Sequence, residues 1–210
     1  SAQSILSKYN NRFIGNSNNL SCFSLHPTKN LGGIGDGGFI TTNNKAKYQK
    51  ILLLRNHGLA KRGVVKIPGR NSRLDEINAA TLSLKLDYLV SDTKKKINIS
   101  KLYDKHLTNK IGKPNYGCCK GITHTFHRYV IRVKKRKLLL SYLKKHKIDA
   151  KVHYEKNIHK QDNFKKYLKN NQKLVTTDNF SNKVVSLPIN QFLNNKQIQF
   201  VIDKINFFYE

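Results

Sequence analysis

The sequence contains no methionine and few acidic residues. Among 210 residues there is no Met, and 12 Asp and Glu stand against 40 Lys and Arg, which gives a formal net charge of +28. Because translation begins with Met, a chain that starts at Ser1 is expected to be processed, trimmed or an internal piece of a longer protein. No apolar run approaches the roughly 18–20 residues of a membrane span, and no signal peptide is recognisable at the start. The sequence therefore predicts a soluble, cytoplasmic protein with no membrane partner.

The excess of basic residues is carried by lysine. Only eight of the 40 basic residues are Arg, which leaves 32 Lys. Arg is the residue that recognises bases and phosphates through paired hydrogen bonds, and Asn and Ile are abundant beside Lys. We interpret the charge as compositional drift, so that nucleic-acid binding is the less favoured alternative. A nucleic-acid module would need aromatic residues between basic ones on one face, whereas Tyr and Phe are predicted to lie mostly at core-like positions.

Cysteine is also scarce. The three cysteines are Cys22, Cys118 and Cys119, and an odd count with two adjacent members predicts neither a disulfide framework nor a four-ligand zinc site. His153 and His159 are six residues apart without a carboxylate at ligand spacing. We therefore expect reduced thiols and no metal.

The hydrophobic residues, 38% of the chain, suffice for a folded core and alternate between strand-like and helical patterns. In the longest helical run Leu74, Ile77, Ala80, Leu84 and Leu86 recur at near-helical spacing, and Gly112 and Pro114 interrupt the chain after it. Strands that alternate with helices indicate an α/β or α+β fold with a boundary near residues 108–116. Strands are expected at 20–24, 37–42, 126–133, 149–154 and 184–187, and helices at 44–55, 73–107, 137–146 and 196–208.

The densest chemistry lies in the segment Ser24–Gly38. Gly33, Gly35 and Gly38 match the spacing of a dinucleotide-binding loop, but that loop must open a helix, and the residues after Gly38 are strand-like. A lysine that follows a strand and precedes flexible glycines can instead hold an aldehyde cofactor as a Schiff base, provided that its amine is neutral. Lys29 stands at this position, and Ser24 could reach a phosphate group. The alternative is that Lys29 is one more surface lysine.

This segment resembles the pyridoxal phosphate lysine segment of the DegT/DnrJ/EryC1/StrS family of sugar aminotransferases. The likeness continues in register over nearly the whole chain. Its further landmarks are Ala2-Gln3, Arg55–Gly58, the Gly-x-Asn-x-Arg element within Gly69–Ala80, His127–Arg132, Val152–Tyr154 and Ser186–Pro188.

The resemblance implies an α/β fold, that of the pyridoxal phosphate-dependent transferases of fold type I, which resemble aspartate aminotransferase. Residues 1–110 would be the C-terminal part of the cofactor-binding large domain, including the long helical connection. Residues 111–210 would be the small α+β C-terminal domain.

The resemblance also implies roles for individual residues. Lys29 would form the internal aldimine and then shuttle protons, Ser24 would bind the cofactor phosphate, and Gln3 would lie against the pyridine ring. Asn71 would reach the phosphate of the neighbouring subunit's cofactor, which implies a homodimer with shared active sites. Each has a structural alternative, since Ser24 could only cap a turn, Gln3 could belong to a frayed terminus, and Asn71 could cap the helix that follows.

Substrate residues are less clearly marked. His57, His153 and His159, with Tyr154, are candidates for lining a sugar-nucleotide cleft, or they are ordinary loop residues. Glu155 and Asn157 stand where the family usually has prolines, which weakens the carry-over to His153.

The implied function is the transfer of an amino group, by analogy from glutamate, to a nucleotide-linked keto sugar in a ping-pong reaction. The family's aspartate that pairs with the pyridine nitrogen would fall one position before Ser1. This chain is therefore expected to be a fragment that shows no transamination alone. A dehydratase of the same family, a regulatory relative and a basic nucleic-acid-binding module remain alternatives, but dehydratases typically replace the lysine by histidine, and Lys29 is present.

Overall fold

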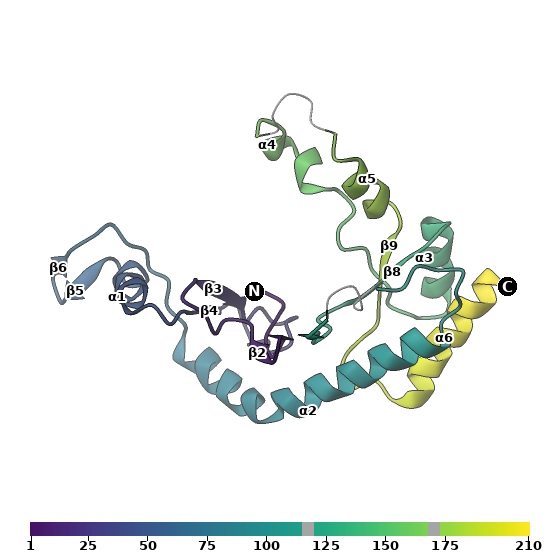
Figure 1. Cartoon of the computed structure of the whole chain (residues 1–210), viewed down its shortest axis with the longest axis horizontal. Helices are drawn as coiled ribbons and strands as arrows, with labels where there is room; N and C mark the ends of the chain where they lie inside the picture. Colours follow the sequence, from purple (N-terminus) through teal and green to yellow (C-terminus); the bar gives the residue numbers. More distant parts are fainter. Residues whose placement is uncertain (115–119, 168–172) are drawn as a thin grey trace. The chain divides into compact units, whose positions relative to one another are not determined.

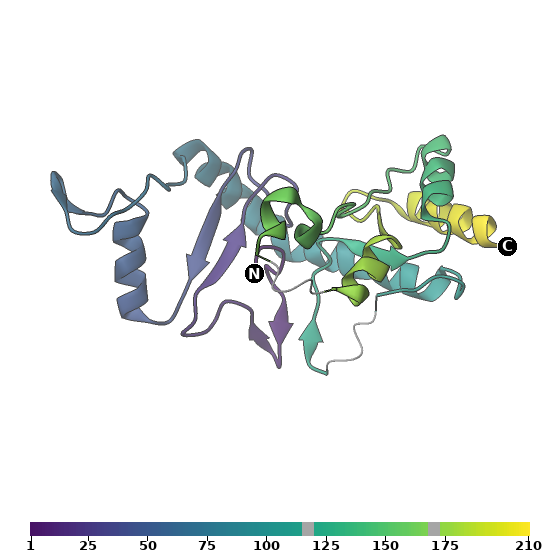
Figure 2. The same cartoon turned by 90° about the horizontal axis from the view of Figure 1, so that it is seen from above.

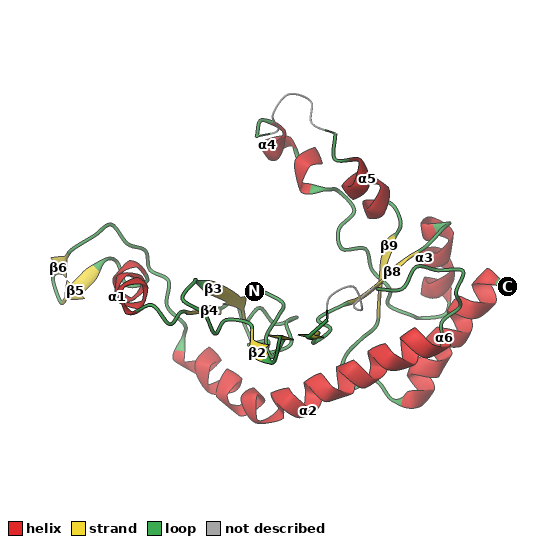
Figure 3. Cartoon of the chain, viewed as in Figure 1, coloured by secondary structure: helices red, strands yellow, loops and turns green. Residues whose placement is uncertain are grey.

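The structure, a computed structural model, describes residues 1–114, 120–167 and 173–210. These residues form two compact units, one from Ser1–Lys94 and 120–127 and the other from 95–114, 128–167 and 173–210. A single helix, α2 (Glu76–His106), contributes residues to both units (Figures 1 and 3). The domain boundary predicted between residues 110 and 111 stays a prediction. Among the described residues, no helix combines the length and the apolar character that crossing a bilayer requires.

The first unit contains three small antiparallel sheets and helix α1. The hairpin of β3 and β4 pairs Ser21 with Thr41 and Ser24 with Gly38, and its two arrows lie side by side in Figure 2. A three-stranded sheet has the order β2-β1-β7, and β5 pairs with β6. The elements are β1 (Lys8–Tyr9), β2 (Arg12–Phe13), β3 (Ser21–Ser24), β4 (Gly38–Thr41), α1 (Lys45–Leu54), β5 (Leu59–Lys61), β6 (Val64–Val65) and β7 (Ile122–Thr123).

The core of this unit is small. Leu82 and Leu89 of α2 are buried with Leu25 and Leu31 from the loop between β3 and β4. Around this cluster pack the half-buried side chains of Ile5, Leu6, Phe39 and Leu74. Helix α1 forms as predicted because Asn44 caps it, accepting from the amide of Lys47. Its expected apolar face buries no residue.

The second unit is built on the antiparallel pair β8 and β9, in which Tyr129 faces Leu187 and Arg132 faces Val184. Helices α3 and α6 supply most of the remaining core, with Leu139, Leu143, Ile202 and Ile205 almost fully buried. The Tyr103 hydroxyl of α2 donates to the carbonyl of Pro188 at 2.7 Å. The elements are β8 (Tyr129–Arg132), α3 (Arg136–Lys145), the 3-10 helix η1 (Ile158–Lys160), α4 (Asp162–Lys165), α5 (Val175–Ser181), β9 (Val184–Leu187) and α6 (Asn195–Tyr209).

Three expectations are wrong. Residues 149–154 are not a strand, because only Lys151 pairs with Ser186 of β9, and Tyr154 is 69% exposed. In α2 the buried stripe is not the predicted one, since Ile77 and Leu84 face solvent while Leu82 and Leu89 are buried. The aromatic residues are mostly not in the core. Of those described, only Phe23, Tyr103, Phe126 and Tyr129 are buried.

Candidate active site

Lys29 lies on the turn that joins β3 to β4. The amide of Leu25, just after β3, donates to the carbonyl of Gly37 at 2.8 Å, and the amide of Gly33 donates to the carbonyl of Leu25 at 2.8 Å. These two bonds close the base of the loop. Beyond them the amide of Lys29 donates to the carbonyl of His26 at 2.9 Å, which forms a tight turn. The Lys29 side chain is half-buried.

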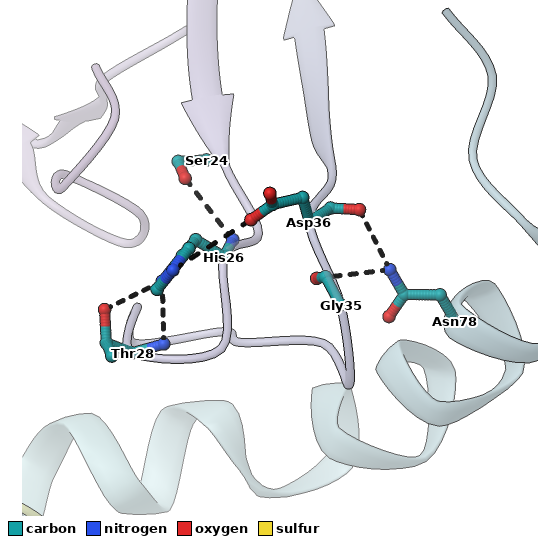
Figure 4. A network of polar contacts seen from close by, with 6 residues as sticks. All are labelled: Ser24, His26, Thr28, Gly35, Asp36 and Asn78. Atoms are coloured by element: carbon teal, nitrogen blue, oxygen red, sulfur yellow. Dashed lines mark hydrogen bonds and ion pairs between the residues drawn. The ribbon is translucent and has the colours of Figure 1, made fainter.

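The polar side chains of the loop are organised around His26 (Figure 4). The amide of Thr28 donates to His26 Nδ1 at 3.2 Å, and because an amide can only donate, Nδ1 is the unprotonated ring nitrogen. The proton of the neutral ring is then on Nε2, which faces Asp36 Oδ1 at 3.9 Å. The Thr28 hydroxyl lies 3.0 Å from the same Nδ1. His26, although exposed, is therefore held within the turn by hydrogen bonds.

Ser24 has a role in this turn. Its Oγ accepts from the amide of His26 at 3.3 Å, which is the turn-capping role considered for it. Accepting one bond leaves the hydroxyl hydrogen available for donation. The structural role and the predicted phosphate-binding role are therefore compatible.

The glycines of the loop allow close approach of other groups. A Cβ at Gly32 would lie 2.2 Å from the carbonyl oxygen of Pro27, and one at Gly33 would lie 2.0 Å from Asn78 Oδ1. Strand β4 begins at Gly38, so no helix follows these glycines. The exclusion of a dinucleotide-binding loop is confirmed.

Neighbouring segments hold the loop on two sides. Asn78 of α2 accepts from the amide of Ile34 at 3.1 Å and donates to the carbonyls of Gly35 and Asp36 at 3.5 and 3.4 Å. Lys85, also on α2, donates through Nζ to the carbonyl of Gly32. These contacts were not predicted. The sequence does hold one indication of them, because Asn78 is a polar residue on the same helical stripe as the apolar Leu74 and Leu82.

The second support comes from the segment before β8. Asn30, next to the lysine, donates through Nδ2 to the carbonyl of Thr125 at 2.9 Å. The hydroxyl of Thr125, which is almost fully buried, lies 3.0 Å from that of Ser7. The lysine turn is thereby tied to the start of the chain through Thr125.

Gln3 is exposed and lines a cavity of about 670 Å³ together with Ile14, Ile122 and His124. The residues that follow it are not frayed, because the amide of Ser7 donates to Ser4, and Ile5 and Leu6 pack against the cluster that contains Leu25 and Leu31. The structure therefore brings the segment of Gln3 to the same core as the lysine turn.

His57 and Asn71 lie on adjacent segments of the first unit. The amide of His57 donates to the carbonyl of Arg70 at 2.9 Å, and Asn56 forms a bridge with Asn71. Asn71 does not cap α2, which begins at Glu76; its Oδ1 accepts from Arg73 Nε at 3.1 Å. Both side chains are exposed and accessible to a ligand.

His153 and Tyr154 belong to the second unit, where they line a cavity of about 470 Å³ with Asn157 and Phe180. His153 Nδ1 accepts from Arg128 Nη1 at 3.2 Å and lies 2.9 Å from the hydroxyl of Ser186. Since a guanidinium can only donate, the imidazole carries its proton on Nε2. Burial, and then the positive charges of Arg128 and Lys151, lower the pKa of His153 and favour this neutral form.

His159 is not free to act as an isolated ligand. Its Nε2 lies 3.0 Å from Asp178 Oδ1, which also accepts from Lys160 Nζ and from Asn157 Nδ2. The hydrogen bond from Lys160 is the main cause that holds the pKa of Asp178 below its usual value. Asn157, which stands where the family usually has proline, thus belongs to a polar cluster around Asp178.

The predicted residues divide between the two units. Ser24 ends β3 and Lys29 lies on the loop that follows it. Gln3, His57 and Asn71 belong to the same unit, and the other candidates are in the second. In residues 1–114, 120–167 and 173–210, no three His, Cys, Asp or Glu residues are grouped as metal ligands. Cys118 and Cys119 lie outside the described residues, and Cys22 is a free, exposed thiol.

Comparisons with known proteins agree with this arrangement. The model of the DegT/DnrJ/EryC1/StrS aminotransferase family matches residues 1–206. A pleiotropic regulatory protein from Geobacillus stearothermophilus is 34% identical over 99% of this chain and 56% of its own length. The dTDP-3-amino-3,6-dideoxy-alpha-D-galactopyranose transaminase of Aneurinibacillus thermoaerophilus is 34% identical over 94% of this chain and 54% of its own length.

A solved structure also matches over the whole length of this chain. DesV from S. venezuelae, crystallised in complex with a ketimine intermediate, superposes with a TM-score of 0.95 at 30% identity, covering all of this chain and 56% of DesV. This likeness confirms the predicted fold class, a pyridoxal phosphate-dependent transferase of fold type I. The chain spans about half the length of the curated relatives it matches. By the extent of these matches, the chain belongs to the DegT/DnrJ/EryC1/StrS aminotransferase family.

Proposed function

We propose that this chain supplies the cofactor lysine of a pyridoxal phosphate-dependent aminotransferase that acts on a nucleotide-linked keto sugar. The observation that carries the proposal is Lys29 on the loop after Ser24, in a chain matched by the family model over residues 1–206. The family depends on pyridoxal phosphate. Relatives named as transaminases of dTDP-linked amino sugars support the substrate class.

The side chains present fit this cofactor in kind. An aldehyde needs a primary amine, which Lys29 provides, and a phosphate needs donors, which the Ser24 hydroxyl and the Asn71 carboxamide provide. Gln3 offers a carboxamide for the pyridine ring or its 3-hydroxyl. When bound, the cofactor supplies an electron sink for the carbon that loses or gains the amino group.

The residues of the chain would divide the work as follows. Lys29 would hold the cofactor through its amine and, once released, move a proton at the reacting carbon. Its place on a turn that backbone hydrogen bonds close would fix the backbone from which the amine extends, which contributes to the positioning that catalysis requires. Ser24 would fix the phosphate and thereby orient the ring.

We also propose which residues contact the substrate. His57, His153 and Tyr154 would contact the nucleotide-linked sugar, and the neutral His153 would do so as a donor through Nε2. The amino donor would be glutamate, as the family analogy suggests. The many lysines would favour a substrate that carries a pyrophosphate.

We propose further that the active protein is a cytoplasmic homodimer. Asn71 supports the dimer, because its exposed carboxamide would serve the phosphate of the partner's cofactor. Exposed Cys22 is consistent with a reducing compartment.

The test is Lys29→Ala in the protein that carries this chain, with Lys66→Ala as the matched control, since Lys66 is exposed in the same unit. We expect Lys29→Ala to abolish the absorbance band of the lysine-bound cofactor and turnover, while Lys66→Ala retains both. Normal turnover of Lys29→Ala would end the assignment. The chain alone is expected to show no measurable transamination, because it spans only about half the length of its relatives.

The alternatives are less well supported. A dehydratase is not favoured, because Lys29 is retained and the named relatives are transaminases. One relative is named a pleiotropic regulatory protein, but Ser24 and Lys29 are both present here, which favours catalysis. Binding to random-sequence DNA that weakens steeply with salt would revive the nucleic-acid alternative.

A further inference from the structure

Asn78 is the buried polar side chain that contacts the lysine loop from α2. Only 4% of its surface is exposed, and all of its hydrogen-bonding contacts with the loop go to backbone atoms of three successive residues. The oxygen accepts from the amide of Ile34. The amide nitrogen donates to the carbonyls of Gly35 and Asp36, as Figure 4 shows. A carboxamide is the neutral side chain that can accept once and donate twice.

We propose that Asn78 is a positioning residue for Lys29, acting through the glycine-rich half of the loop. The consequence for Lys29 rests on the proposed function, whereas the claim that Asn78 fixes the loop does not.

Close contacts show how little freedom the loop has against α2. A Cβ at Gly33 would lie 2.0 Å from Asn78 Oδ1, and a Cβ at Gly37 would lie 2.8 Å from Leu74 Cδ1. The backbone at Gly33 and Gly37 therefore lies directly against the side chains of Asn78 and Leu74. A larger residue at either glycine would push the loop away from these two side chains.

The position of this half of the loop is transmitted to the lysine. Gly33 donates to the carbonyl of Leu25, and Gly37 accepts from the amide of the same residue. Residues 33–37 are thus bonded at both ends to Leu25, and the arc of residues 26–32, which contains Lys29, begins directly after Leu25. A shift of the glycine-rich half would move the base of the arc as well.

The alternative is that Asn78 is only a satisfied polar group of the core. Such a residue would affect the stability of α2 as a whole, and would not change Lys29 selectively. Local amide exchange and the reactivity of Lys29 distinguish the two roles.

The experiment compares Asn78→Leu, which keeps the volume without the hydrogen bonds, with Asn78→Asp, which keeps the oxygen for Ile34. The control is Ser83→Ala, an exposed residue of α2 whose hydroxyl bonds only within the helix. Amide exchange is measured by NMR on the protein that carries this chain. Lys29 reactivity is measured as the rate of labelling by dilute pyridoxal phosphate with borohydride, relative to exposed Lys66.

A lost hydrogen bond in a buried site costs about 1–3 kcal/mol, or roughly a fivefold to hundredfold change in an equilibrium. We expect exchange of the Ile34 amide to rise by about this factor in Asn78→Leu and by less in Asn78→Asp. The α2 amides and the control should be unchanged. Lys29 labelling should fall at least about fivefold in Asn78→Leu.

Unchanged exchange of Ile34 in both variants would overturn the proposal, as would exchange that rises equally throughout α2. Faster local exchange with unaltered Lys29 labelling would overturn the positioning role. If Lys29 of the unmodified protein that carries this chain is labelled no faster than Lys66, the proposed function fails, and the exchange data still decide whether Asn78 fixes the loop.

Discussion

The two units of the chain differ in how much apolar surface they bury. Among the described residues, sixteen of the buried apolar side chains belong to the second unit and six to the first. The large apolar side chains that remain exposed show the opposite distribution, with seventeen in the first unit and ten in the second. The unit that carries Lys29 therefore depends less on its own core and more on polar contacts and close backbone packing.

The difference predicts where truncation of a core side chain is most costly. Leu139→Ala removes a side chain with 0% exposure from α3 and is expected to lower the free energy of unfolding by about 2–5 kcal/mol. Leu138→Ala, on the same helix but 62% exposed, should change it by less than about 0.5 kcal/mol. Urea unfolding measures both.

The matched pair in the first unit is Leu82→Ala and Leu84→Ala, one buried and one exposed on α2. Leu82→Ala should cost less than Leu139→Ala, because fewer neighbours surround it and the cavity can collapse. Equal costs at the two buried sites would remove the distinction between the units.

The helix caps give a smaller test of the same difference. In α6 the Asn194 side chain accepts from the amide of Gln197, and the Gln197 side chain accepts from the amide of Asn194. Asn194→Ala is expected to cost about 1 kcal/mol, because α6 buries four side chains and its unwinding would expose them. Asn195→Ala, one residue later, is the control.

Asn44 caps α1 in a similar way, but α1 buries no residue. Asn44→Ala should therefore loosen α1 locally, seen as faster amide exchange, with little change in the urea midpoint. A midpoint shift as large as that of Asn194→Ala would show that α1 is part of the cooperative core.

The smallest expected effect concerns pH, and each unit contributes one histidine. Burial lowers the pKa of His124 in the first unit and of His153 in the second. A folded-state pKa below the ordinary value of 6.5 means that the unfolded chain binds protons more readily. Stability is then fully present above this value and falls as the pH drops below it.

Replacing either histidine by Gln should therefore make the urea midpoint less dependent on pH between about 8 and about 5. Both effects are expected to be modest, because His153 is only half-buried and His124 is exposed, so that solvent screens each shift. A pH dependence that stays the same in both variants would contradict the assigned neutral forms.

The sequence was informative where local chemistry decides the structure. The strands beside Lys29 and helices α3 and α6 follow from turn residues and periodicity, and they were predicted within a few residues. The short helices η1, α4 and α5 were not predicted. The long helix was predicted, but its buried side was not, because two apolar stripes run along it. The buried stripe contains Asn78, and only the loop that it contacts explains why a polar residue stands there.

Other errors arise from contacts that are distant in sequence. Val152 and Tyr154 alternate like strand residues, yet the segment leaves β9 after Lys151, where His153 bonds Arg128 and Ser186. The roles of Asn78 and Thr125 depend on partners 44 and 95 residues away. The local sequence pattern does not predict contacts between residues so far apart in the chain.

The contact between Gly33 and Asn78 also has an evolutionary consequence. Because a Cβ at position 33 would lie 2.0 Å from Asn78 Oδ1, a side chain at position 33 requires Asn78 to move or to be replaced by a smaller residue. Related chains are expected to substitute the two together, with a side chain at position 33 accompanied by a smaller residue at position 78. The pair would be inherited as one unit, although 44 other positions separate its members.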